Sequence, residues 1–431
     1  MSDRFRSVNR QMPYLMPPSL EEAYDGRGSE AYHPKMLLAL LFYGYATGTY
    51  SSRKIEEATY DSVAFRYVAA NQHPDHDTTK AFRRRFLEEL EGLFVQILEV
   101  AVEMGLLEVG DVALDGTKVK ANALKHKALS YEHACKLEDQ LMEEVEELME
   151  KAEEADAEEL PEETSVPEEI ARREERLEKI REAKQTIEER ARERHEAEKA
   201  AYEEKMEKRR EEEKRTGRKK PGPKPEPPED TGPEPDDQVN LTDEESRIMH
   251  TSDNGFQQAY NAQATVCMDS HLIVGGHISQ KSNDKQELKP ALQDLSELPE
   301  RVGSPDRLAA DSGYYSSDNA QACEDHRITP YISTGREKHN QTWKERFSEP
   351  EGTPEEESGL EAMAYRLETR EGKDFYGRRK GTAEPIFGIV KEAMGIRQFL
   401  LRGLEKVKGE WALIRCAFNL KRMHRLLGQA T

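Results

Sequence analysis

Apolar residues recur at helical spacing over the first quarter of the chain. The segment 33–48 is strongly apolar and ends on a glycine suited to a helix C-terminus. A second helix is expected after a serine cap at Ser51 or Ser52. Beyond a turn-like stretch at 71–77, one long amphipathic helix is expected from the spacing of Phe82, Phe86, Leu90, Phe94, Ile97 and Ala101. These patterns predict an all-α N-terminal domain over residues 1–105.

Three consecutive arginines, Arg83, Arg84 and Arg85, lie just after the expected start of that long helix. A helix-turn-helix DNA reader places contact residues near the N-terminus of its recognition helix, and the arginines match this arrangement. A plain helical bundle with a basic, solvated turn explains the same residues equally well. Both interpretations stay open.

Beyond residue 105 the apolar pattern changes to the short runs typical of strands. A short strand at 112–115 is expected to end on Asp115, and a second at 308–310 is followed directly by Asp311. Further strands are expected at 258–268, 271–279 and 327–333, and helices at 284–295 and 316–326. This order, completed by a terminal helix that carries Glu384, predicts a mixed α/β (α+β) fold in which helices cover a mixed sheet.

Residues 126–240 interrupt this order. Apolar residues step by three and four along 141–155 and again along 170–191, although Arg173 and Lys184 occupy positions on the second seam. A coiled-coil hairpin over 126–215 explains the pattern, and a single solvated helix laced with charge pairs is the alternative. The segment 216–240, rich in Pro and Gly, is expected to be a disordered linker. Its basic core at 217–225 either lies in a DNA minor groove or is simply solvated.

The formal net charge of −22 first argues against a DNA-binding protein, so its distribution matters. Residues 131–240 hold about 38 acidic and 22 basic side chains, which leaves a net charge of only about −6 for the rest of the chain. Much of that remainder lies in one acidic segment, 345–361. The acidity is therefore local, and other surfaces can be basic.

Composition also limits the compartment. The four cysteines are scattered without a CxxC pair, which argues against a zinc module or a disulfide framework and fits a reducing cytosol. The first residues have no apolar core of signal-peptide length, and no run approaches the roughly 18 apolar residues of a membrane span. We therefore expect a soluble, cytoplasmic protein without a membrane partner.

Asp115, Asp311 and Glu384 form a candidate catalytic set. Carboxylate oxygens suit Mg²⁺ or Mn²⁺, and two such ions can activate an attacking oxygen and stabilise the leaving oxygen of a phosphodiester. A lone aspartate at a strand end is usually a turn residue, so this interpretation depends on the combination of all three.

The region around Glu384 supports that combination most. Pro385 is tolerated in a first helical turn and Thr382 can cap a helix, so a helix is expected to begin beside Glu384. Lys391 lies two turns later on the same face. The basic run 378–380 lies immediately upstream and is suited to contact phosphates. A capping glutamate beside an exposed basic turn is the alternative.

These motifs together resemble the DDE transposases of bacterial insertion sequences, in particular insertion sequence family eleven eighty-two. Its wider group carries a signature of Tyr, two residues, Arg, three residues, Glu, six residues and Lys. Tyr376 and Arg379 match the first interval, and Glu384 and Lys391 match the last. The middle interval is one residue longer here, and Lys380 has the three-residue spacing without being an arginine.

Other segments share the resemblance. They are 32–58 and 74–86 for the N-terminal domain, 114–123 and 309–316 for the two aspartate motifs, and 255–266 with 279–288 for the intervening sheet. The resemblance implies an RNase H-like catalytic core. The expected domains are a DNA-binding domain at 1–105, the catalytic domain at 106–125 and 241–431, the inserted hairpin at 126–215 and the linker at 216–240.

The family also implies roles for the site residues. Asp115, Asp311 and Glu384 would hold Mg²⁺ or Mn²⁺, two ions in all, while DNA is cut at the element's ends and the freed 3′-hydroxyl attacks target DNA. The family implies that Tyr376, Arg379 and Lys391 contact the DNA backbone beside the cut. The further candidates for DNA contact are Lys380, from the basic run, and Arg83, Arg84 and Arg85, from the helix-turn-helix interpretation. For Tyr376 the alternative to DNA contact is a purely structural role as a ring packed in the protein interior.

The implied partners are double-stranded DNA, as terminal inverted repeats and target, and a second copy of the chain in a homodimer on DNA near the nucleoid. Three alternatives differ from this interpretation. The first is an RNase H-like metal-dependent nuclease that cuts without rejoining, and the second is a catalytically inactive DNA-binding regulator. The third is a coiled-coil scaffold, which only residues 131–215 support.

Overall fold

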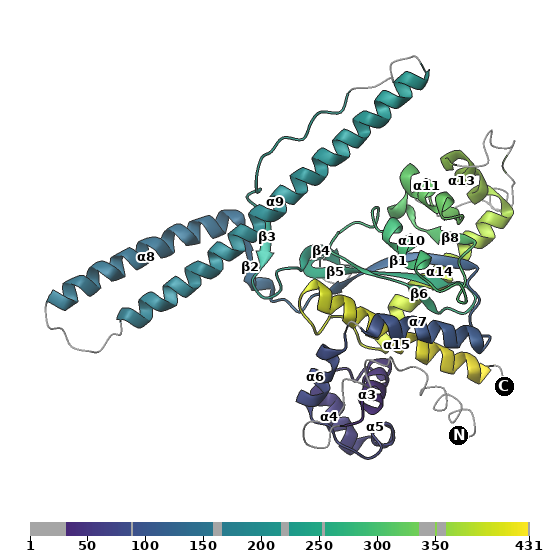
Figure 1. Ribbon diagram of the computed structural model, residues 1–431, viewed down its shortest axis with the longest axis horizontal. Helices are drawn as coiled ribbons and strands as arrows, with labels where there is room; N and C mark the ends of the chain where they lie inside the picture. Colours follow the sequence, from purple (N-terminus) through teal and green to yellow (C-terminus); the bar gives the residue numbers. More distant parts are fainter. Residues whose placement is uncertain are drawn as a thin grey trace. The chain divides into compact units, whose positions relative to one another are not determined.

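The computed structural model describes residues 32–87, 89–157, 166–216, 224–251, 255–335, 350 and 359–429. It divides into two compact units. The sheet unit comprises residues up to Asn122 and from Ser246 onward, and the inserted unit comprises Ala123–Glu245. Figure 1 shows the elements of both units. Within the described ranges, no helix combines the length and the apolar character that crossing a membrane requires.

Five helices open the sheet unit: α3 (Pro34–Thr47), α4 (Ser52–Asp61), α5 (Val63–Val68), α6 (His76–Arg85) and α7 (Glu89–Glu103). As predicted, α3 ends at Gly48, whose φ of 82° is readily adopted by glycine. Ser51 is the N-cap residue of α4, although its side chain makes no capping hydrogen bond.

The single long helix expected across residues 82–101 is wrong, because the chain forms α6 and α7 instead. Helix α6 packs against α3 and α4, whereas α7 packs against α15 (Leu404–Gln429). One straight helix cannot direct its apolar residues to both sets of partners, so the break between α6 and α7 follows from packing and not from local propensity.

A mixed sheet lies at the centre of the unit, in the order β4-β5-β1-β8-β9. These strands are β4 (Arg247–Thr251), β5 (Gly255–Cys267), β1 (Asp111–Lys120), β8 (Arg307–Ala310) and β9 (Thr329–Ile332). Two short strands, β6 (Ile273–Gly275) and β7 (Ile278–Ser279), also pair with β5. Strand β1 is antiparallel to β5 and parallel to β8, which confirms the mixed sheet that the sequence predicts.

Strand β1 does not end at Asp115 as expected, but continues to Lys120. The reason is the length of β5, whose 13 residues supply pairing partners as far as Lys120. Ala259 in β5 pairs with Lys120 on one side and with Arg247 of β4 on the other. The chain therefore leaves the sheet after β1 and returns in β4, with only β5 between the two strands.

The helices around the sheet are α10 (Leu288–Ser296), α11 (Ser317–Asp325), α13 (Gly359–Glu368), α14 (Arg370–Gly388) and α15. Helix α14 contacts β1, β5 and β8. The predicted start of this helix beside Glu384 is wrong, because Thr369 caps it by accepting a hydrogen bond from the Gly372 N–H. Pro385 lies near the other end of α14, just before the helix changes to a π-helical turn at Ile389–Ala393.

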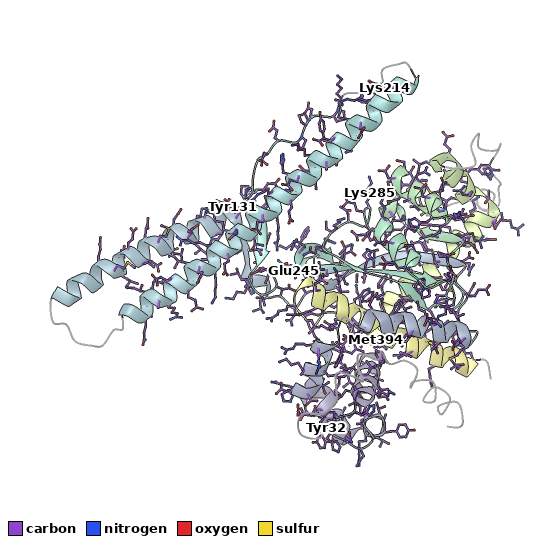
Figure 2. All side chains as sticks on the ribbon, viewed as in Figure 1. Tyr32, Tyr131, Lys214, Glu245, Lys285 and Met394 are labelled. Carbon is purple, nitrogen blue, oxygen red and sulfur yellow. The ribbon has the colours of Figure 1, made fainter. Side chains whose placement is uncertain are left out.

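The inserted unit contains β2 (Ala128–Ser130), α8 (Tyr131–Ala157), α9 (Val166–Thr216) and β3 (Gln238–Asn240). Tyr131 and Lys214 mark the start of α8 and the end of α9 in Figure 2. The buried residues Leu141, Leu177, Ile180, Ala183 and Ile187 join the two helices along an apolar seam.

The charged residues on that seam pair across it. Arg173 Nε lies 2.9 Å from Glu144 Oε2, and Lys184 Nζ lies 3.0 Å from Glu138 Oε2. Higher residue numbers on α9 therefore match lower ones on α8, so the helices run antiparallel. The charges on the seam are compatible with packing because each has an opposite partner at the edge of the apolar contact.

The linker expected at 216–240 is only partly described. Residues 217–223, most of its basic core, lie outside the described residues, as do 345–349 and 351–358 of the acidic segment. The expectation of disorder is wrong for the last residues, because β3 pairs with β2 and Asp237 accepts two 2.8 Å hydrogen bonds from Arg194.

Candidate active site

The three predicted carboxylates come from elements that pack together. Asp115 lies within β1, Asp311 directly follows the parallel neighbour β8, and Glu384 lies in α14, which packs on both strands. Asp311 also caps a short 3-10 turn, because its Oδ1 accepts the Gly313 N–H at 2.8 Å. The Asp115 side chain is only 17% exposed, whereas that of Glu384 is 55% exposed. The site therefore has a buried and an open side.

Arg379 lies between two of these carboxylates. Its guanidinium is 3.7 Å from Asp115 Oδ2 and 3.5 Å from Glu384 Oε1, and its side chain is only 8% exposed. It also lies over the Tyr376 ring, 5.7 Å from the centroid. Tyr376 itself is half-buried and packs against an apolar cluster between α14 and the sheet. Its ring therefore forms a fixed surface against which the Arg379 guanidinium packs.

Negative charge is concentrated around Asp115. Burial is the largest cause of a raised pKa of this carboxyl, the charges of Asp311 and Glu384 also raise it, and the resulting pKa is about 6. The Gly116 N–H and Arg379 act in the opposite direction but do not offset the burial. An ionised Asp115 therefore costs free energy in this setting, and a further nearby cation would lower that cost.

The chemistry of these donors fits a hard divalent cation, because all three are carboxylates that repel one another. Across the described ranges, no three His, Cys, Asp or Glu side chains are grouped closely enough to hold a metal ion. In the structure the cation between Asp115 and Glu384 is Arg379. Its Nε is buried and has no hydrogen-bond partner among the described residues.

Lys391 reaches the same site from beyond α14. Its Nζ donates a 2.6 Å hydrogen bond to Thr117 Oγ1, two residues after Asp115 in β1. The predicted regular helical spacing from Glu384 to Lys391 is wrong, because the π-helical turn at Ile389–Ala393 intervenes. Lys391 nevertheless contacts the strand that carries Asp115.

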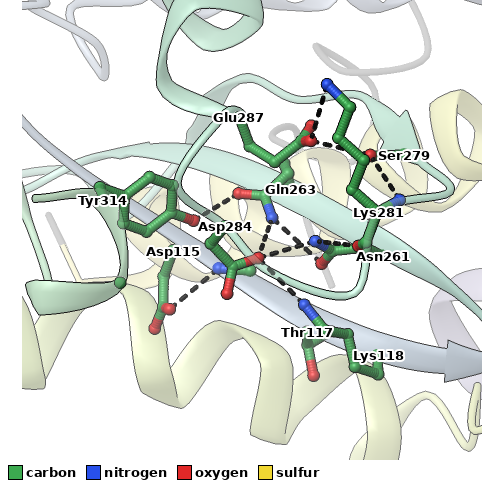
Figure 3. Close-up of polar contacts among 12 residues, drawn as sticks. Asp115, Thr117, Lys118, Asn261, Gln263, Ser279, Lys281, Asp284, Glu287 and Tyr314 are labelled. Carbon is green, nitrogen blue, oxygen red and sulfur yellow. Dashed lines mark hydrogen bonds and ion pairs between the residues drawn. The ribbon is translucent and has the colours of Figure 1, made fainter. Parts of the chain in front are cut away.

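A buried polar network behind β1 was not predicted (Figure 3). Its centre is Asp284, whose Oδ1 accepts hydrogen bonds from Lys118 Nζ at 3.0 Å, Asn261 Nδ2 at 2.7 Å and Gln263 Nε2 at 2.8 Å. Tyr314, which follows Asp311, donates its hydroxyl to Gln263 Oε1. The sequence does hold one signal of this network. Asn261 and Gln263 lie at alternate positions of the buried strand β5, so both point to one face of the sheet and need hydrogen-bond partners there.

The network occupies the space that a side chain at Gly116 would fill. A Cβ at this position would lie 2.2 Å from Gln263 Nε2 and 3.0 Å from Asp284 Oδ1. We expect Gly116→Ala to lower the free energy of unfolding by about 1–3 kcal/mol, because Gln263 or β1 must move. Urea denaturation measures this change. Gly92→Ala in α7, where a Cβ meets nothing within 4 Å, is the control and is expected to cause no loss. Equal stability of both variants would contradict the prediction.

Two family models match the chain. The model described as Transposase domain (DUF772) matches residues 2–85, and the model described as Transposase DDE domain matches residues 216–420. The second match includes Asp311 and Glu384, which the structure places beside Asp115. The segment 216–420 is thus similar to transposase DDE domains. The two matches support a function in DNA transposition, performed by an enzyme that cleaves nucleic acid. No curated protein and no solved structure matches the chain.

Asp115 lies between the two matched segments of the chain, and only the fold joins it to them. Its partner strand β5 and the neighbouring β8 both belong to the DDE match. The insertion after β1 separates Asp115 from these strands in the sequence, whereas strand pairing returns it to their side.

The three arginines that the sequence predicts to contact DNA occupy different environments. All three lie in the last turn of α6 and not near a helix start, so the proposed position in a helix-turn-helix reader is wrong. Arg83 is 6% exposed and donates a 3.2 Å hydrogen bond to the Tyr45 hydroxyl, which donates in turn to the buried Glu410. Arg84 and Arg85 are exposed, as is Lys380 on α14.

Arg83 is therefore expected to act on stability. Arg83→Met should lower the free energy of unfolding by about 3–5 kcal/mol, because Glu410 would lose the cation near its buried carboxylate. Arg84→Met is the matched control, for which we expect a change within about 0.5 kcal/mol. Thermal and urea unfolding of both variants provide the measurement. Equal stabilities would show that Arg83 has no such structural role.

Proposed function

We propose that this chain is the transposase of a bacterial insertion sequence that cuts DNA at the element's ends and joins those ends to target DNA. The observation that carries this proposal is the meeting of Asp115, Asp311 and Glu384 around Arg379, in a chain whose segment 216–420 is similar to transposase DDE domains. We further propose that the sheet with its flanking helices is an RNase H-like core, and that the chain belongs to insertion sequence family eleven eighty-two.

Asp115, Asp311 and Glu384 are the residues that would hold Mg²⁺ or Mn²⁺. Bound there, a pair of ions supplies charge stabilisation for the attacking and leaving oxygens of a phosphodiester. The residues of the chain position these carboxylates: strand pairing of β1 with β8 places the aspartates, and α14 places the glutamate. The open side at Glu384 leaves room for DNA to approach.

Positive side chains beside the carboxylates suit the DNA backbone. Lys391 donates a hydrogen bond to Thr117, two residues along β1 from Asp115. Arg379 has a buried N–H without a hydrogen-bond partner among the described residues. A phosphate at the site would meet both groups, and such contacts fix the register of the DNA without selecting its sequence. We propose that Lys380, Arg84 and Arg85 contact DNA from exposed positions, and that Tyr376 acts through Arg379.

The test uses the purified full chain with DNA duplexes that carry the genomic sequence on each side of its gene. With Mg²⁺ or Mn²⁺ present, we expect cuts at the terminal repeats and transfer of a labelled end into a second duplex. Asp115→Asn is the inactive control, and a duplex of scrambled sequence controls for specificity. Cutting without transfer would replace the proposal with a nuclease. Binding without cutting would indicate a DNA-binding regulator.

We propose that two copies of the chain act on the DNA together, because joining requires both ends to be held at once. Light scattering after size-exclusion chromatography tests this point. We expect a mass of two chains when a duplex carrying the terminal repeat is bound. A complex with a single chain would contradict the dimer and leave the cleavage assay unaffected.

A further inference from the structure

Asp284 joins the two strands that carry and support the first catalytic aspartate. It lies between β7 and α10, outside the sheet, and its three nitrogen donors belong to β1 and β5 (Figure 3). The Lys118 side chain is only 14% exposed, and its ammonium forms an ion pair with Asp284. One carboxylate oxygen thus holds a buried charge and two amides in a fixed arrangement.

The network contacts β1 at the residue next to Asp115. Successive side chains of a strand point to opposite faces, so Gly116 and Lys118 lie on the face opposite to Asp115. In the absence of a Gly116 side chain, Asp284 Oδ1 approaches to within 3.0 Å of the position that a Cβ would take. Asp284 therefore supports β1 directly behind the catalytic carboxylate.

The network also reaches the loop that follows β8. A Cβ on Gly313 would lie 3.8 Å from Asp284 Cβ, and the Tyr314 hydroxyl donates to the same Gln263 whose Nε2 donates to Asp284. Gly313 in turn donates its N–H to Asp311 Oδ1. A path of contacts thus leads from Asp284 through Gly116 to Asp115 and through Tyr314 and Gly313 to Asp311, although no hydrogen bond joins Asp284 itself to either carboxylate among the described residues.

We propose that Asp284 is a positioning residue that sets the separation of Asp115 and Asp311, and through it the affinity of the site for a divalent cation. This inference rests on the proposed function. Metal ligands are held in place by the residues that contact them, and loss of such a residue costs about 10–100-fold in metal affinity or activity. A displacement of about 1 Å at the reacting groups costs roughly 100-fold in rate.

The experiment compares the wild-type chain with Asp284→Ala and Asp284→Asn. Calorimetry with Mn²⁺ alone, without DNA, measures metal binding, and single-turnover cleavage of the bordering duplex measures the rate. For Asp284→Ala we expect Mn²⁺ affinity to fall by about 10-fold or more and the rate by about 100-fold, with DNA affinity within about twofold of wild type. Asp284→Asn retains an acceptor oxygen, so it should recover at least about a tenth of the wild-type rate.

Asp294→Ala is the matched control. Asp294 is another partly buried carboxylate, in α10, and it hydrogen-bonds His277 at 2.9 Å. Its loss should lower the thermal midpoint without changing Mn²⁺ affinity or cleavage rate. The inference is overturned if Asp284→Ala retains wild-type Mn²⁺ affinity and rate, or if both variants lose them equally. If the wild-type chain itself neither binds Mn²⁺ nor cuts DNA, the proposed function fails and this inference fails with it.

Discussion

Asp115→Asn is expected to stop DNA cleavage and at the same time to stabilise the folded chain at neutral pH. The variant loses the charge with which this side chain would hold a divalent cation, so the rate of cleavage should fall on the order of 1,000-fold or more. The shape of the side chain is unchanged, and its hydrogen bond from the Gly116 N–H can be kept. Single-turnover cleavage assays with Mg²⁺ and with Mn²⁺ measure the loss.

The gain in stability follows from the pKa of about 6, which burial raises from 3.8. Above pH 6 the folded chain carries an ionised Asp115 at a cost that the unfolded chain does not have. Asparagine removes this cost, so the variant should be more stable by about 1–3 kcal/mol at pH 7. As the pH falls from about 6 to about 4, the wild-type carboxyl takes up its proton in the folded chain, and the difference should disappear.

Asp111→Asn is a control of opposite sign on the same strand. Burial opposes the charge of Asp111, but hydrogen bonds from Arg307 and the nearby charges of Arg307 and Arg378 outweigh it and lower the pKa of this carboxyl. Its neutral variant should therefore be less stable than wild type at pH 7. Urea unfolding at pH 7 and pH 4 measures both variants. If Asp115→Asn is no more stable than wild type at pH 7, or if it cleaves DNA at the wild-type rate, the proposed role of Asp115 is contradicted.

Arg379→Met is expected to be the most destabilising change at the site. Methionine fills much of the same space but leaves Asp115 and Glu384 without the cation between them. Removal of one member of a buried charged group typically costs about 3–5 kcal/mol. The loss of stability should be larger at pH 7 than at pH 5. At pH 5 the Asp115 carboxyl, whose pKa is about 6, is largely protonated and needs no cation beside it.

Added Mg²⁺ should raise the thermal midpoint of Arg379→Met more than that of the wild-type chain, because a bound cation replaces the missing charge. Lys380→Met is the control for stability, since the Lys380 side chain is exposed and its loss should change stability by less than about 0.5 kcal/mol. If Arg379→Met unfolds like this control, the guanidinium does not balance the carboxylates.

The sequence was most informative where a local pattern and the fold agree. The apolar run before Asp311 is a buried strand, and Gly48 ends α3 in the conformation expected of a glycine. It misled where tertiary contacts decide. Asp115–Gly116 resembles a strand end, yet β5 extends the pairing beyond it, and Pro385 resembles a helix start although Thr369 begins α14 far upstream.

Other features of the site could not be predicted because they join distant positions. Lys118 and Asp284 are 166 residues apart, and neither stands out by composition or spacing. Arg83 belongs to a basic run that suggests DNA contact, but a partner near the C-terminus, Glu410, gives it a buried role through Tyr45. In both cases the decisive fact is which side chain lies opposite, and pattern analysis of a single sequence does not supply it.

The position of the insertion has a consequence for the history of the gene. Lys120 and Arg247 flank the same residue of β5, so the ends of the sheet at which the inserted unit is attached are only about 10 Å apart, two strand spacings. A short loop is able to span that distance. The 123–245 segment can therefore be lengthened, shortened or exchanged in descendants of this gene without a change in the strand order around Asp115, so we expect this stretch to diverge faster than the sheet.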